Sequence, residues 1–76
     1  MNVNIVKIDN ADYIILDALE VNNNRYLILS NVNNNEDVIV RKVTKENGED
    51  YLVLLDNEEE LNDVLMSFNN KHRKGE

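Results

Sequence analysis

The chain has 76 residues, no cysteine and no proline, and its 15 acidic and 8 basic side chains give a formal net charge of -7. This length allows one domain with a small core, and the lack of cysteine excludes disulfides and thiolate metal sites. The negative charge argues against nucleic acid or an anionic membrane as the main partner, because phosphate binding needs clustered Lys and Arg.

Five apolar segments separated by short breaks predict β-strands, because β-branched residues alternate with polar ones in most of them. The breaks are too short for a parallel crossover, so the strands should be antiparallel neighbours. Asn47-Gly48 supplies the two positive-φ residues of a type I′ hairpin turn, and Asn22-Asn23-Asn24 joins two segments in the same way. The segments are Val3–Ile8, Tyr13–Val21, Arg25–Ser30, Asp37–Thr44 and Asp50–Asp56.

The last of these segments leads into an amphipathic helix. Residues 51–55 are apolar at every position, which favours a strand covered on both faces, with the helix as the cover of one face. An apolar stripe at helical spacing follows, formed by Leu61, Val64, Leu65 and Phe68. If the Phe68 ring is buried, its replacement by Ala should cost about 3 to 5 kcal/mol.

Acidic residues gather where this helix should begin. Asp56 or Asn57 can accept the N-cap hydrogen bonds, and Glu59 or Glu60 can close a capping box. The carboxylates also face the positive end of the helix dipole. Consecutive glutamates on a helix point in different directions, whereas a cation site needs carboxylates around one point, so a cap is favoured over a metal site.

No constellation in the chain predicts catalysis. His72 is the only histidine, on the helical side of Leu65 and Phe68, and no partners for a general base or a metal site cluster around it. The hydroxyl residues stand in no strand-turn-helix elbow, and the two glycines form no phosphate-binding loop. We therefore expect a non-enzymatic protein with no catalytic residue, cofactor or metal.

These observations predict the fold class α+β: an antiparallel β-meander of four to five strands with one C-terminal α-helix packed on one face. Residues 1–70 should form a single domain, and residues 71–76 a basic, mobile tail. The N-terminus lacks a basic region followed by an apolar run, so we expect a cytoplasmic protein with no membrane segment.

From Tyr13 onward the order of features resembles the YrzB-like family of small acidic bacterial proteins, a domain of unknown function. The resemblance is carried by residues 25–29, by residues 36–43, and by the strand-to-helix segment 51–68. It implies a small cytosolic bacterial protein and supplies no catalytic residue.

Two functions are therefore open. The first is a non-enzymatic interaction or regulatory module that binds another protein through its uncovered sheet face or edge strand. The alternative is a phage-type inhibitor that mimics nucleic acid, which requires one continuous acidic ridge and binding that weakens with salt. A homodimer through the open sheet face is a further arrangement. The candidate partner surface comprises Asp56, Glu58, Glu59, Glu60, Asp63 and Met66.

Overall fold

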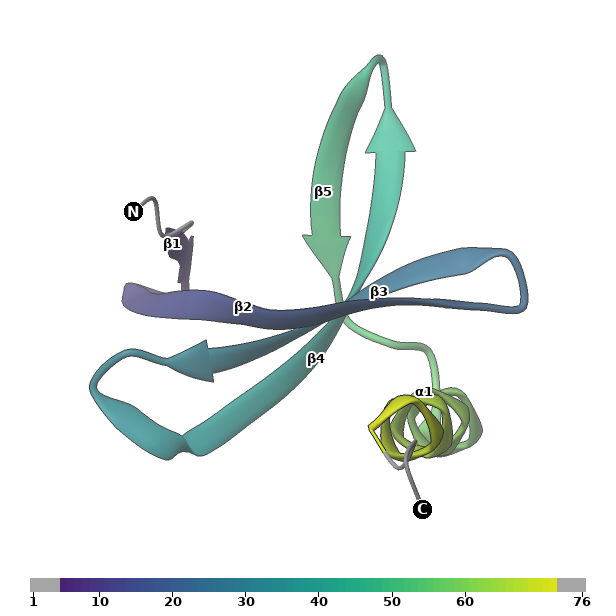
Figure 1. The fold of residues 1–76 in the computed structure, drawn as a ribbon. Coiled ribbons are helices and arrows are strands. Elements are labelled where there is room, and N and C mark those ends of the chain that lie inside the picture. The colour runs from purple at the N-terminus through teal and green to yellow at the C-terminus, as the bar shows by residue number, and fades with distance from the viewer. Residues whose placement is uncertain (1–4, 73–76) are drawn as a thin grey trace.

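A computed structural model describes residues 5–72 as five antiparallel strands followed by one helix. The elements are β1 (Ile5–Ile8), β2 (Ala11–Val21), β3 (Asn24–Asn31), β4 (Asn34–Glu46), β5 (Glu49–Val53) and α1 (Glu58–Lys71). The strands lie side by side in chain order in one strongly twisted sheet (Figure 1). The predicted α+β meander is thus confirmed. Residues 3 and 4 of the first predicted strand, and residues 73–76 of the predicted tail, lie outside the described residues.

Three of the four hairpin turns place two consecutive residues at positive φ, as a type I′ turn requires. They are Asp9–Asn10 (52° and 69°), Asn22–Asn23 (53° and 70°) and Asn47–Gly48 (52° and 82°). The second and third confirm the predicted turns. Between β3 and β4 the chain turns without positive φ, and the Oδ1 of Asn31 accepts the backbone N–H of Asn33 at 2.8 Å.

The central strand β3 carries buried side chains on both faces. Ile28 is 3% exposed on the face that carries the helix, and Leu29 is fully buried. Since successive side chains of a strand point to opposite faces, Leu29 lies on the far face. There, the Tyr13 hydroxyl donates to Asp37 Oδ2 at 2.7 Å.

The prediction that strand five is covered on both faces is wrong. Tyr51 is 45% exposed, and Leu54, just beyond β5, is 69% exposed. The reason is topological: β5 is an edge strand, and it pairs only with the C-terminal half of β4, from Lys42 to Glu46. The helix that follows β5 turns away from it and packs against β2.

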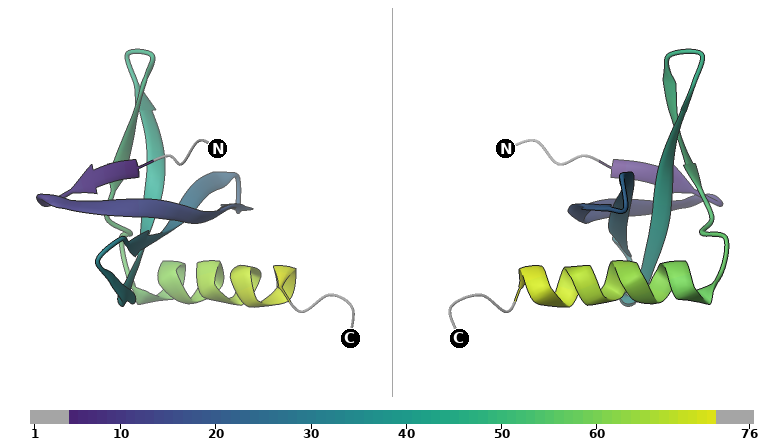
Figure 2. Two further views of the ribbon diagram at one scale, coloured as in Figure 1. Left: turned by 60° about the vertical axis from the view of Figure 1, so that its left-hand side comes forward. Right: turned by 90° about the vertical axis from the view of Figure 1, so that its right-hand side faces the viewer.

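Helix α1 crosses one side of the sheet, with β1 and the tip of the β4–β5 hairpin on the other side (Figure 2). Val64 is fully buried and joins Leu19, Tyr26 and Ile28 in one core cluster. The predicted apolar stripe has the correct spacing, but Phe68 is half-buried at the margin of this cluster. The cost of truncating Phe68 should therefore be lower than that of a buried ring.

We predict that Val64→Ala lowers the free energy of unfolding by about 2 kcal/mol, because a fully buried side chain loses its transfer energy and leaves a cavity. Urea unfolding followed by circular dichroism measures this loss. Met66→Ala on the same helix, at a position 62% exposed, is the matched control and should change stability by less than about 0.5 kcal/mol. Equal losses in the two variants would contradict the packing described.

Candidate functional site

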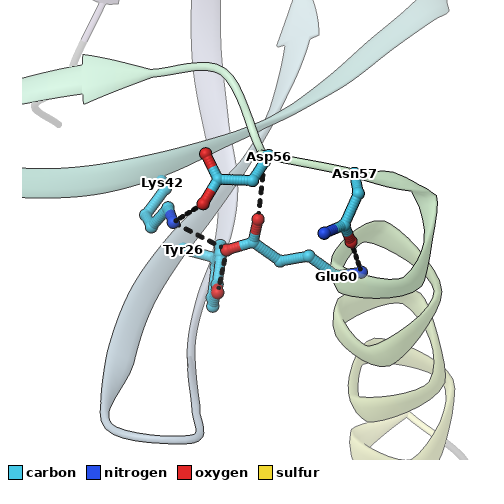
Figure 3. Close-up of polar contacts among 5 residues, drawn as sticks. All are labelled: Tyr26, Lys42, Asp56, Asn57 and Glu60. Carbon is cyan, nitrogen blue, oxygen red and sulfur yellow. Dashed lines mark hydrogen bonds and ion pairs between the residues drawn. The ribbon is translucent and has the colours of Figure 1, made fainter.

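The start of α1 is held by one carboxylate, that of Glu60 (Figure 3). Asn57 caps the helix from an extended backbone, and its Oδ1 accepts the N–H of Glu60 at 2.8 Å. Glu60 Oε1 in turn accepts the N–H of Asp56 at 2.7 Å, one residue before the cap. The predicted N-cap is therefore confirmed at Asn57, whereas the reciprocal bond of Glu60 reaches the N–H of Asp56 and not that of the cap residue, as a capping box would require.

The second oxygen of Glu60 binds the sheet. Its Oε2 accepts the Tyr26 hydroxyl of β3 and lies 2.9 Å from Lys42 Nζ of β4. The side chains of Glu60 and Lys42 are each only 15% exposed. This carboxylate therefore fastens the first turn of the helix to two strands.

These contacts shift the pKa values of Glu60, Tyr26 and Lys42 in the directions that favour a charged Glu60, a charged Lys42 and a neutral Tyr26. Hydrogen bonds from Tyr26, Lys42 and the Asp56 N–H lower the pKa of Glu60 from 4.5 to about 2. Burial and the neighbouring Glu60 raise the pKa of the Tyr26 hydroxyl, and Glu60 raises that of Lys42. The arrangement is a stabilised ion pair with a neutral phenol.

A second contact fixes the end of the helix. Lys71 Nζ lies 2.7 Å from Asp17 Oδ1 of β2, and His72 Nε2 lies 2.9 Å from Oδ2. Lys71 and then His72 lower the pKa of Asp17 to about 2. The His72 ring also packs against Phe68, with centroids 4.4 Å apart. The prediction of a mobile tail from residue 71 onward is therefore wrong for Lys71 and His72, which lie at the helix end and contact the sheet.

One of the six residues predicted as a partner surface, Glu60, is not part of that surface. Glu60 points inward, whereas Asp56, Glu58 and Glu59 are exposed. At about 100° per residue, Glu58 and Asp63 lie about 140° apart around the helix axis. Glu59 and Met66 lie between them at this spacing, so Glu60 is the helical carboxylate that is missing from the ridge that mimicry of nucleic acid requires.

The structure instead reveals an apolar groove of about 820 Å³ along one side of α1, here named the α1 groove. It exists because α1 packs against β2 and leaves part of β4 uncovered on the same face. Its apolar side chains come from both layers, with Leu16, Val38 and Val40 from the sheet and Leu61, Leu65 and Phe68 from the helix. Leu16, Val38 and Leu65 are each more than a third exposed.

Sequence reasoning missed most of this groove. The predicted apolar stripe contained Leu61, Leu65 and Phe68 on the helical side of the groove, but it was predicted to be buried in the core. Leu16 lies where the register of β2 against β3 shifts, between Ile15 and Asp17, so it does not follow the alternation of its neighbours. The run Ile14-Ile15-Leu16 was the available signal, because three apolar residues in a row cannot all face one core. Met66 lies about 100° around the helix from Leu65, away from the groove.

Within residues 5–72, no group of three or more His, Cys, Asp or Glu side chains could hold a metal ion. The same part of the chain has no helix long and apolar enough to cross a membrane.

A comparison with protein families matches residues 4–71 to a family described as protein of unknown function, DUF1292. The chain belongs to this family. The match spans the whole meander and the helix, so the α1 groove is built entirely from residues of the DUF1292 domain. Neither the curated proteins nor the solved structures gave a match.

We predict that Glu60→Gln lowers stability at neutral pH and flattens its dependence on acid. The pKa of Glu60 is about 2 in the folded chain and near 4.5 when unfolded, so its stabilisation is fully present above pH 4.5 and is lost as the pH falls towards 2. Urea unfolding from pH 7 to pH 2 measures this slope. Asp17 should retain its own, smaller part of the acid dependence in the variant.

The matched control for this experiment is Glu59→Gln, because Glu59 is exposed and precedes Glu60 in the same helical turn. Its acid profile should superimpose on that of the parent chain. A profile for Glu60→Gln as steep as the parent's would show that the carboxylate does not carry the acid sensitivity.

Proposed function

We propose that this DUF1292 protein is a non-enzymatic interaction module that binds another protein through the α1 groove. The observation that carries the proposal is a groove lined by apolar side chains of the sheet and the helix, several of them exposed. Contiguous exposed apolar surface is costly in water and typically marks a site of protein contact. The buried contacts of Glu60 and Val64 hold both walls in place before a partner arrives.

The proposal includes a bacterial, cytoplasmic setting. It is supported by the likeness of residues 25–29 and 51–68 to the YrzB-like proteins and by the absence of cysteine from the chain. A regulatory role fits a domain of this size, because a small domain can change a partner's activity by covering part of its surface, without being an enzyme itself.

The proposal predicts that a photo-crosslinking amino acid in place of Leu65 or Val38 forms a covalent adduct with one specific protein in cells of the natural host. Both side chains line the groove and are exposed to a partner. The same amino acid in place of Met66 is the matched control, because Met66 is also exposed but points away from the groove. Adducts are identified by mass spectrometry.

Failure to form an adduct at Leu65 and Val38, or equal adducts at Met66, would contradict docking in the groove. An adduct at both groove positions, lost when Leu16→Lys places a charge in the groove, would support it.

A further inference from the structure

The α1 groove reaches the backbone edge of β4 and not only its face. Four consecutive residues, Val38 to Arg41, line it. Successive side chains of a strand point to opposite faces, so two of these four residues line the groove with their backbone or from around the strand edge. The groove therefore offers main-chain groups as well as apolar side chains.

The pairing of the sheet shows why this edge is open. β3 pairs with β4 along most of its length, whereas β5 pairs with β4 only from Lys42 to Glu46. Beyond Val53 the chain leaves the sheet to begin α1. Within residues 5–72, no strand continues the line of β5 alongside Val38 to Arg41. Arg41 Nη1 donates to the carbonyl of Val40 at 3.0 Å, so a side chain serves a main-chain acceptor on this stretch.

We propose that the α1 groove binds an extended segment of a basic partner protein, which adds to the sheet as a strand along residues 38–41 of β4. The proposal rests on the proposed function and names the partner's chemistry. An added strand forms main-chain hydrogen bonds with the open edge, and every second side chain enters the groove against Leu61, Leu65 and Phe68. The segment continues the line of β5 and runs antiparallel to β4, like every other neighbour in the sheet.

Net charge favours a different protein over a second copy of this chain as the occupant of the α1 groove. Each copy carries a net charge of -7, so two copies repel, whereas a basic segment is attracted. Every lysine of residues 5–72 is already in an ion pair with a carboxylate, and Glu58, which lines the groove, is in none of these pairs. Arg41 also lines the groove, and its guanidinium donates to the carbonyl of Val40. Asp56, exposed just before the helix, pairs with Lys42 and keeps a second carboxylate at this end of the groove. The basic residues of the segment therefore lie at its N-terminal end, next to the start of α1.

The main-chain requirement is tested with synthetic peptides and the intact chain. The probe is a nine-residue peptide with two N-terminal lysines followed by alternating valine and threonine. Its affinity is measured by titration with backbone amide NMR, and we expect shifts centred on Val38 to Arg41 and on Leu65. Methylating the peptide nitrogens that face β4 should weaken binding roughly ten-fold, because each lost donor leaves a main-chain acceptor unpaired. Methylating the alternate, outward nitrogens should change it by less than roughly two-fold.

The side-chain and charge requirements are tested on the same peptide. Leu65→Lys should weaken binding roughly ten-fold, whereas the matched Met66→Lys should leave it unchanged within roughly two-fold, since only Leu65 lines the groove. A peptide with two N-terminal glutamates should bind roughly three-fold more weakly or worse at low salt, and added salt should narrow this difference.

Equal effects of inward and outward methylation, or tighter binding of an amphipathic helical peptide, would overturn strand addition. A dimer in light scattering that protects the amides of residues 38–41 from exchange would show a second copy as the occupant and would also overturn it. Crosslinking at Leu65 and Val38 in cells, combined with failure of every extended peptide, would refute only this mode of binding. Peptide binding without any cellular adduct would refute the proposed function and leave the edge chemistry intact.

Discussion

The position of α1 depends on one carboxylate, which binds the segment before the helix and two strands of the sheet. Glu60 binds the N–H of Asp56 before the helix, the hydroxyl of Tyr26 on β3 and the ammonium of Lys42 on β4. A charge this shielded is tolerated only because donors surround it, and removal of Glu60 would leave Lys42 with only the exposed Asp56 as its partner. The contact therefore fixes where the helix starts and how it crosses the sheet. With its start held there and its end held at Asp17, α1 covers β2 and leaves part of β4 open.

Strand β4 has two halves with different roles. Its C-terminal half lies between β3 and β5 and completes the meander. Its N-terminal half pairs with β3 alone and forms the floor of the α1 groove. Open edges are a liability in a soluble protein, because they template pairing with other chains. Here the helix shelters this edge on one side, so access is limited to a segment that fits between strand and helix.

The meander, the predicted turns and the helix cap could be read from the sequence because each depends on local chemistry. Asn47-Gly48 adopts positive φ at low cost, and Asn57 can cap whichever surface the helix meets. Burial could not be read in the same way. The apolar run of 51–55 had the composition of a covered strand, and the stripe containing Leu65 had the composition of a core helix. Whether either is covered depends on where the helix packs against the sheet. The inward carboxylate of Glu60 was missed as a sheet contact because its partners lie 18 or more positions away in sequence, as the pairs with Lys42 and Tyr26 show.

The same ion pair has a consequence for the alignment of β4. A strand displaced by one residue turns every side chain to the opposite face. In β4 a slip in one direction would place Val43 opposite Glu60 and leave the carboxylate without a cation, whereas a slip in the other direction would place the Arg41 guanidinium there. Either slip would turn Val38 and Val40 away from the helix. The apolar residues of β4 would tolerate this shift, since Ile39 and Val43 also alternate along the strand. Lys42, whose side chain is 15% exposed, thus opposes the slip toward Val43 in a strand whose hydrophobic pattern fits two registers almost equally well.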